Sequence, residues 1–195
     1  MSLAELENIK RLGASSGRKV VYLESVLGVP FSYGNQIRVL QNGDEIFPAM
    51  LEAIEEAESS VNFLTYIYWT GEIARKFAEL LSRKAEEGVH VRVLIDAFGG
   101  GKMRECLLKQ MKDAGVVMRW FRPFRRRFWD FDKRPHRKLL ICDQKVGFTG
   151  GVGIAAEWEG DARDSSEWRE THFQFWGDSV RYLDGAFWDD WFEVD

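Results

Sequence analysis

A histidine, a lysine and an aspartate recur at fixed spacing in the stretch HRKLLICDQKVGFTGG, residues 136–151. His136 and Lys138 are two positions apart, so in a β-strand their side chains project from the same face. A neutral imidazole is a competent nucleophile near pH 7 and can form a covalent phosphohistidine. An ammonium group beside it neutralises charge that develops on phosphoryl oxygens. The two residue types at this spacing therefore indicate phosphoryl or phosphatidyl transfer.

The same stretch predicts a hairpin, because two apolar runs, KLLIC and VGFT, flank the polar residues 143–145. If the second and third of these polar residues form the tip, Lys138 lies opposite Gly151 and His136 lies opposite Gly153. The glycines would then leave a shelf on which a phosphate group can approach main-chain amides.

Asp143 is an odd number of positions from both reactive residues, so in an unbroken strand it points to the other face. We therefore expect it to support the turn or a neighbouring group. We expect no cofactor and no metal, because the three histidines fall in different predicted elements: His90, His136 and His172.

Strand and helix patterns alternate from Gln36 onward, which predicts an α/β fold: a mixed, largely parallel β-sheet flanked by helices on both faces. Residues 1–34 are expected to form an N-terminal helical arm, and residues 35–195 a single domain. The predicted strands are QIRVL, VNFLTYIYW, VHVRVLID and VVMRWF, and helices are expected from Asp44, after Thr70 and over about 102–114.

The loop FGGGK, residues 98–102, is not a phosphate-binding P-loop. Asp96 stands where the first glycine of that motif belongs, and Met103 replaces its serine or threonine. We interpret the loop as a flexible connection between a strand and a helix.

The charge distribution is uneven. The chain has 195 residues and a net charge of -4, yet residues 119–138 alone sum to +7 and the remainder to -11. A basic segment in an acidic protein indicates a localised anionic partner. Neither a signal peptide nor a run of about 20 apolar residues is visible. The two cysteines, Cys106 and Cys142, are expected to be reduced, which fits a cytoplasmic setting.

The stretch resembles the HxKxxxxDxxxxxxGG signature of the phospholipase D superfamily, whose positions fall on His136, Lys138, Asp143, Gly150 and Gly151. The likeness extends in outline over most of residues 35–195. The segments GNQIRVLQNGDEIFPAMLEAIEEAESSVNFLTYIYW, EEGVHVRVLIDAFGG and WRETHFQFWGDSV are similar to the first half of bacterial cardiolipin-synthase-like members.

The resemblance implies that His136 is the nucleophile or general acid, that Lys138 binds phosphate and that Asp143 is an orienting partner. Gly150 and Gly151 complete the motif as candidate phosphate contacts.

Two departures from the family pattern stand beside the motif. Gly153 occupies a position where many relatives carry an asparagine that contacts phosphate, which puts that donor in doubt. Lys133 replaces another asparagine, three residues before His136, and brings positive charge closer to the anion. Gly153 and Arg134 are further candidate phosphate contacts.

Catalysis in this superfamily resembles a relay between two histidines from two copies of the motif, and this chain has one copy. His172 is the in-chain substitute, although a structural strand histidine is the preferred interpretation. Two explanations stay open: the chain is one half of a two-motif protein, or it completes its site as a homodimer. The aromatic C-terminal segment DGAFWDDWFEVD is expected either under the chain's own sheet or at such an interface.

Aromatic residues alternate with arginines in RWFRPFRRRFWDFDKRPHRK, just before the motif. This pattern fits an anionic membrane surface, single-stranded nucleic acid, or a solvated loop. The resemblance favours a phospholipid phosphodiesterase or phosphatidyltransferase, located in the bacterial cytoplasm and peripheral at the inner membrane. The alternatives are a homodimeric endonuclease and a catalytically incomplete half.

Overall fold

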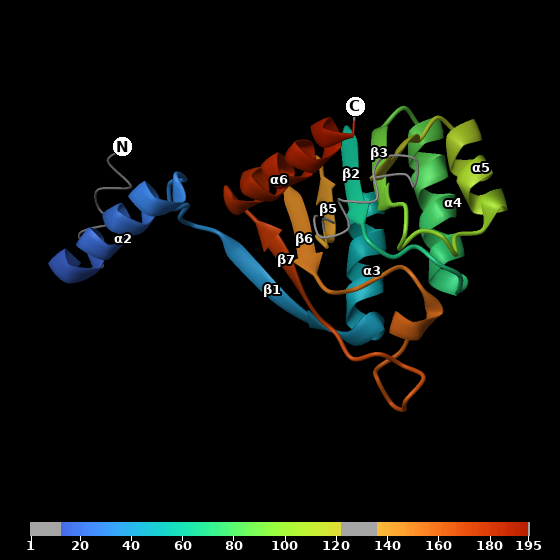
Figure 1. Ribbon diagram of the computed structural model, residues 1–195, viewed down its shortest axis with the longest axis horizontal. Helices are drawn as coiled ribbons and strands as arrows, with labels where there is room; N and C mark the ends of the chain where they lie inside the picture. The colour runs from blue at the N-terminus through green and yellow to red at the C-terminus, as the bar shows by residue number, and fades with distance from the viewer. Residues whose placement is uncertain (1–12, 122–135, 195) are drawn as a thin grey trace.

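A seven-stranded mixed sheet forms the centre of the protein (Figure 1). The computed structural model describes residues 13–121 and 136–194. Its elements are α2 (Gly13–Leu27), β1 (Gln36–Gln41), α3 (Asn42–Glu55), β2 (Ser60–Thr65), α4 (Glu72–Glu86), β3 (His90–Asp96), α5 (Glu105–Asp113), β4 (Val117–Phe121), β5 (Leu139–Cys142), β6 (Val146–Gly150), the 3-10 turn η1 (Ala156–Trp158), β7 (Thr171–Trp176) and α6 (Ser179–Glu193).

The strands lie in the order β1-β7-β6-β5-β2-β3-β4. The pairs β2–β3 and β3–β4 are parallel, as expected where strand and helix alternate. The pairs β1–β7, β7–β6, β6–β5 and β5–β2 are antiparallel. The predicted mixed α/β sheet is therefore confirmed, but antiparallel pairing is more common than expected, because β5 enters the sheet antiparallel to β2 and turns back as a hairpin into β6.

Helices cover both faces of the sheet, as predicted (Figure 1). On one face α3, α4 and α5 pack over the larger core cluster, which includes Phe63 and Phe77. On the other face α6 packs over Leu139 and Ile141 of β5.

Two tight helix ends lead into the parallel strands. After α4, Gly88 has φ +93, and the Val89 amide donates to the Lys84 carbonyl at 3.0 Å. After α5, Gly115 also has φ +93, and the Val116 amide donates to the Met111 carbonyl at 3.0 Å. A glycine accepts this left-handed conformation without steric cost and lets the chain turn sharply into the next strand.

The sequence left open whether the aromatic C-terminal segment lies under the chain's own sheet or at an interface. Phe187 is fully buried and Trp191 is 4% exposed, and both belong to the core cluster beneath α6. Phe192 is 64% exposed. The aromatic segment therefore packs mainly under the chain's own sheet.

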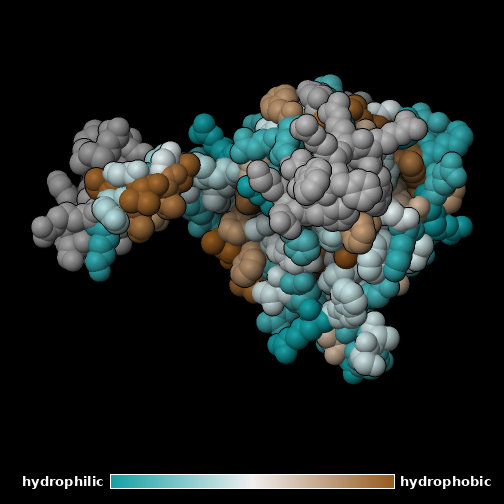
Figure 2. Space-filling model, viewed as in Figure 1, coloured by the Kyte–Doolittle hydropathy of each residue, from teal (hydrophilic) through white to brown (hydrophobic). Residues whose placement is uncertain are grey.

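The predicted N-terminal helix is present as α2, which stands apart from the α/β body (Figure 1). Apolar side chains gather on its surface, as Figure 2 shows, and they include Val21, Tyr22, Leu23, Val26 and Leu27. The division of the chain at residues 34 and 35 stays a prediction. Within the described ranges, none of the helices has the length and apolar content that crossing a bilayer requires.

Candidate active site

His136 and Lys138 lie just before β5, a central strand, at the edge of the sheet where the strand ends meet. Because β5 is antiparallel to β2, with Leu139 opposite Leu64, the residues before β5 lie beside the residues that follow β2. The carboxyl end of β3 reaches the same edge because β3 is parallel to β2. The end of β6 and the start of β7 also lie there, since Gly150 pairs with His172.

The two reactive residues predicted from the motif are brought together. The Lys138 Nζ atom lies 3.0 Å from His136 Nδ1 and donates to the His136 carbonyl oxygen at 2.9 Å. His136 is exposed, whereas Lys138 is only 5% exposed. An imidazole at the surface is thus paired with a cation held beneath it.

The surroundings lower the pKa of both groups. Burial lowers the pKa of Lys138 to about 8, although the charge of Glu170 opposes this effect. Burial and the neighbouring Lys138 lower the pKa of His136 from its ordinary value, and the carboxylate of Asp96 opposes them. Near pH 7 the imidazole is therefore mainly neutral and the lysine mainly charged, which are the protonation states that nucleophilic attack on a phosphodiester requires.

The hairpin is present, but its predicted register is wrong by one residue. Leu139 pairs with Thr149 and Cys142 pairs with Val146, so residues 143–145 form a three-residue turn. This register, continued by one position, places Lys138 opposite Gly150 rather than Gly151. The Thr149 hydroxyl donates to the Lys138 carbonyl at 3.0 Å. This bond joins the two arms of the hairpin just beyond the last residue pair of β5 and β6.

The space left by the motif glycines is occupied by side chains of this chain. A Cβ atom on Gly150 would lie 2.3 Å from His172 Nδ1, and one on Gly151 would lie 2.2 Å from the Glu170 carboxylate. A Cβ atom on Gly153 would meet the side chains of Ile67 and Trp158 at 2.9 Å. The absence of a side chain at these three glycines therefore makes room for His172, for Glu170 and for a core contact. That their main-chain groups contact phosphate stays a prediction. Arg134 lies outside the described residues.

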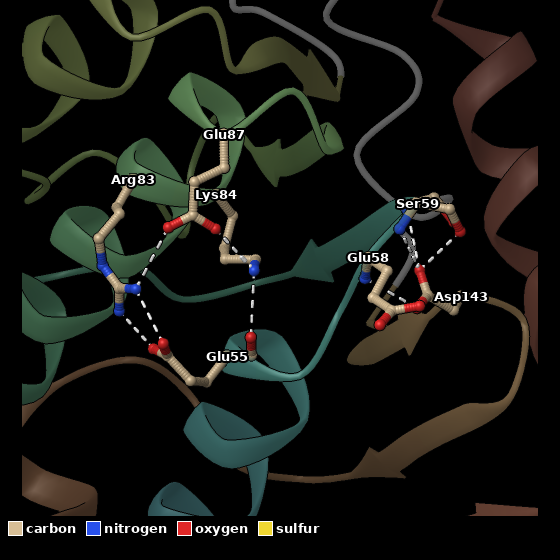
Figure 3. A network of polar contacts seen from close by, with 8 residues as sticks. Glu55, Glu58, Ser59, Arg83, Lys84, Glu87 and Asp143 are labelled. Carbon is tan, nitrogen blue, oxygen red and sulfur yellow. Dashed lines mark hydrogen bonds and ion pairs between the residues drawn. The ribbon is translucent and has the colours of Figure 1, made fainter.

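Asp143 anchors the turn, as its odd spacing predicted (Figure 3). Its carboxylate accepts hydrogen bonds from the amides of Glu58, Ser59 and Ser60 and from the Ser59 hydroxyl, at 2.7–2.9 Å. Partial burial raises the pKa of Asp143, but these hydrogen bonds outweigh it and lower the value to about 2. Asp143 therefore ties the β5–β6 turn to the start of β2.

The left side of Figure 3 shows how α3 and α4 are joined. Lys84 donates to the Glu55 carbonyl at 3.1 Å and pairs with Glu87 at 2.8 Å, and Arg83 pairs with the Glu55 carboxylate. These contacts position two helices beneath the sheet and involve neither His136 nor Lys138.

His172 lies in β7 and is 1% exposed, which fits the interpretation of a structural strand histidine. Burial, together with the charge of Lys138, lowers its pKa to about 4, so it is neutral near pH 7. Its Nδ1 atom is buried and makes no hydrogen bond within the part of the chain that the structure describes.

Three neighbours of the motif were not singled out from the sequence: Tyr66, Asp96 and Glu170. Tyr66 directly follows β2, and Asp96 is the last residue of β3. The carboxyl ends of these two neighbouring parallel strands meet at this edge of the sheet, and that shared position is the signal that could have found both residues. Glu170 lies one residue before β7 and faces Gly151. No comparable sequence signal marks it.

Part of the basic segment 119–138 serves the fold. The Arg119 guanidinium donates to the Trp191 carbonyl at 3.0 Å and lies 4.3 Å from the centre of its ring. Arg137 pairs with Asp190 at 3.1 Å. The remaining arginines of the segment fall within residues 122–135, outside the described residues. Among the residues that are described, no group of three or more His, Cys, Asp or Glu side chains is placed to hold a metal ion.

Comparison with known proteins agrees with this geometry. The family model described as "Cardiolipin synthase, PLD-like domain" matches residues 50–158. A cardiolipin synthase from Geobacillus sp. (strain WCH70) is 37% identical over 165 residues, which cover 84% of this chain and 33% of the relative. The chain thus spans about a third of the length of that relative.

Solved structures show the same fold. Nuc from Salmonella typhimurium, a phospholipase D family member, superimposes with a TM-score of 0.61 at 17% identity, covering 80% of this chain and 94% of Nuc. A phosphatidylserine synthase from Haemophilus influenzae gives a TM-score of 0.57 at 14% identity, covering 77% and 35% of the two chains. The family predicted from the motif is confirmed: the chain belongs to the phospholipase D-like domain family of the cardiolipin synthases.

Proposed function

We propose that this chain supplies one half of the active site of a phosphodiester-processing enzyme that transfers phosphatidyl groups between alcohols. The observation that carries the proposal is the contact between Lys138 and His136 at the edge of a phospholipase D-like sheet. The names of the curated relatives, which are cardiolipin synthases, support a phospholipid substrate.

In the first step, His136 Nε2 attacks the phosphorus atom of a phosphatidyl group. An N–P bond forms, the P–O bond to the leaving alcohol breaks, and a second histidine gives that alcohol its proton. In the second step an acceptor hydroxyl attacks phosphorus, its proton passes to the second histidine, and His136 leaves. Glycerol or phosphatidylglycerol as acceptor gives synthesis, and water gives hydrolysis.

The lysine has two positions in this scheme. While the Lys138 ammonium donates to Nδ1, the proton of the neutral imidazole is on Nε2, and that nitrogen has no lone pair for attack. When a phosphate group arrives, the ammonium moves to its non-bridging oxygens and stabilises the charge that develops there. This movement frees Nδ1 to carry the proton. Main-chain groups of Gly150, Gly151 and Gly153, together with Arg134, would complete the phosphate site.

A second histidine is required to protonate a natural leaving alcohol. It comes either from a second motif in a longer chain or from a second copy of this chain. We place the protein in the bacterial cytoplasm, peripheral at the inner membrane, where anionic phospholipid is available.

A reactive substrate tests the nucleophile without the second half. Bis(p-nitrophenyl) phosphate releases p-nitrophenolate, a good leaving group that departs without being protonated. The chain should therefore release about one equivalent in a burst and become covalently labelled. His136→Ala should lower the burst rate at least about 1,000-fold. The matched control is His90→Ala, which removes an exposed histidine from the opposite end of the sheet. A burst that survives in His136→Ala would sink the assignment.

The substrate class is tested separately. Phosphatidylglycerol vesicles supplied with isotope-labelled glycerol should yield labelled phosphatidylglycerol in the presence of a second motif or in a dimer of this chain. Cleavage of DNA in the presence of EDTA, without lipid exchange, would replace the proposal with the homodimeric endonuclease. Solution mass measured in parallel distinguishes the monomer from the dimer.

A further inference from the structure

The aromatic ring of Tyr66 contacts both motif residues. Its centre lies 4.6 Å from the centre of the His136 imidazole, with the two planes inclined by 56°. Lys138 Nζ lies 5.3 Å from the centre of the same ring. Tyr66 follows the last residue of β2 and is partly buried, so the ring forms one wall beside the exposed imidazole.

The main chain of Tyr66 is held by the glycine loop after β3. A Cβ atom on Gly99 would lie only 1.9 Å from the Tyr66 carbonyl oxygen, so only glycine permits this approach. The Trp69 indole donates to the Gly99 carbonyl at 2.7 Å. The Asp96 carboxylate accepts hydrogen bonds from the amides of Phe98 and Gly99 at 2.8 and 3.1 Å. The loop therefore connects β3 to α5, as expected, and its main chain packs closely against Tyr66.

An exposed histidine loses its orientation unless neighbouring groups restrict rotation about its side-chain bonds. Two neighbours do this for His136, the Lys138 ammonium and the Tyr66 ring. During the proposed reaction the ammonium turns to the phosphate oxygens. The ring is then the contact that continues to orient the imidazole.

We infer that Tyr66 is a positioning residue for His136: its ring keeps the imidazole aimed at phosphorus while Lys138 binds the phosphate, and the close approach of Gly99 fixes the ring. This inference rests on the proposed function. The aromatic face rather than the hydroxyl group carries the effect, because the ring is what contacts His136.

The burst of p-nitrophenolate from bis(p-nitrophenyl) phosphate measures the effect. Tyr66→Phe keeps the ring and should react within about threefold of the wild-type chain, whereas Tyr66→Leu should have a burst rate constant about 10- to 100-fold lower. The half-saturating substrate concentration should change by less than about threefold in both, because the ring orients the nucleophile and does not bind phosphate. The matched control is Tyr22→Leu, in the exposed part of α2.

A second pair of variants moves the support without removing the ring. Gly99→Ala forces the Tyr66 carbonyl to shift and should slow the burst in the same direction as Tyr66→Leu. Gly101→Ala in the same loop should not, because its Cβ atom would meet nothing closer than the Phe98 carbonyl at 3.3 Å. A normal burst rate in Tyr66→Leu, or an equally slow Tyr66→Phe, overturns the inference.

Nuclear magnetic resonance reports on the contact without any reaction. The wild-type chain and Tyr66→Phe should show cross-peaks between this ring and the His136 ring, and their absence overturns the inference. Tyr66→Leu should raise the pKa of His136 toward its ordinary value, because burial is what lowers it. Loss of the burst in His136→Ala together with a normal burst in Tyr66→Leu would reject this inference alone and leave the proposed function intact.

Discussion

Lys138 donates to His136 twice, with Nζ 3.0 Å from the ring atom Nδ1 and 2.9 Å from the carbonyl oxygen. The side chain that makes these contacts is 5% exposed and carries a charge in surroundings that favour its neutral form. The pair therefore places a buried charge against an exposed imidazole, at an electrostatic cost to folding.

The first prediction concerns the pH dependence of the burst. The rate should rise with pH as His136 loses its proton below its ordinary pKa and should fall near pH 8, where Lys138 becomes neutral. Lys138→Arg stays charged at every accessible pH and should remove the falling limb, at a lower absolute rate because a guanidinium has a different shape. Burst rates measured between about pH 5 and 10 decide this. A falling limb that persists in the arginine variant would assign it to another group.

Replacement of Lys138 by methionine should stabilise the fold while it abolishes the burst. The folded-state pKa of about 8 is below the ordinary 10.5, so the unfolded chain binds more protons between these values, and wild-type stability rises as pH increases through this window. Below pH 8 the full cost of the buried charge is present. Lys138→Met should therefore raise the free energy of unfolding at pH 7 by roughly 1–3 kcal/mol and flatten that rise. Urea denaturation at several pH values measures both effects, and a destabilised variant contradicts the argument.

Asp143→Asn should weaken the fold with little direct effect on the chemistry. The carboxylate accepts four hydrogen bonds around the start of β2, and its folded-state pKa of about 2 lies below the ordinary 3.8. Its contribution is therefore present above pH 3.8 and is lost as pH falls toward 2. We expect a loss of about 1–3 kcal/mol at pH 7, measured by urea denaturation. The burst rate at a temperature where the variant is folded should stay within about threefold of the wild type, and a larger loss would give Asp143 a direct part in the reaction.

Gly150→Ala tests the space that this glycine leaves. The new Cβ atom would lie 2.3 Å from Nδ1 of the buried His172, so the imidazole or the strands must move. We expect a loss of about 1–3 kcal/mol in the free energy of unfolding. The burst should also be slower, because His172 lies beside Gly150, and Gly150 lies opposite Lys138. Gly185→Ala in α6 is the matched control, because nothing lies within 4 Å of its Cβ position, and it should be neutral or slightly stabilising. Equal stability of the two variants would show that the strands adjust freely.

The sequence predicted the alternating elements and the pairing of His136 with Lys138, because both depend on local periodicity. It missed the hairpin register because Asp143 and Gln144 adopt positive φ values of 53 and 54 and make a three-residue turn. Neither residue is a glycine, so the positive φ values were not expected, although the three polar residues between the apolar runs match the length of the observed turn.

The surroundings of the motif were harder to predict. Tyr66 and Asp96 reach His136 only through the order of the strands, and that order includes antiparallel pairs that alternation of strand and helix does not predict. The role of the FGGGK loop depends on a close approach to Tyr66, a contact between distant parts of the chain. Local pattern identified the candidate reacting groups, and tertiary packing determines which side chains surround them.

Arg137, which lies between the two motif residues, pairs with Asp190 of α6 and donates to the Ala186 carbonyl at 3.3 Å. The segment that carries His136 is thus attached to α6, about 50 positions away in the chain. Exchange of domains between relatives has to respect this attachment. A chimera that takes the motif from one parent and α6 from another can lose the contacts of Arg137 with Asp190 and Ala186, even though its junction lies far from His136.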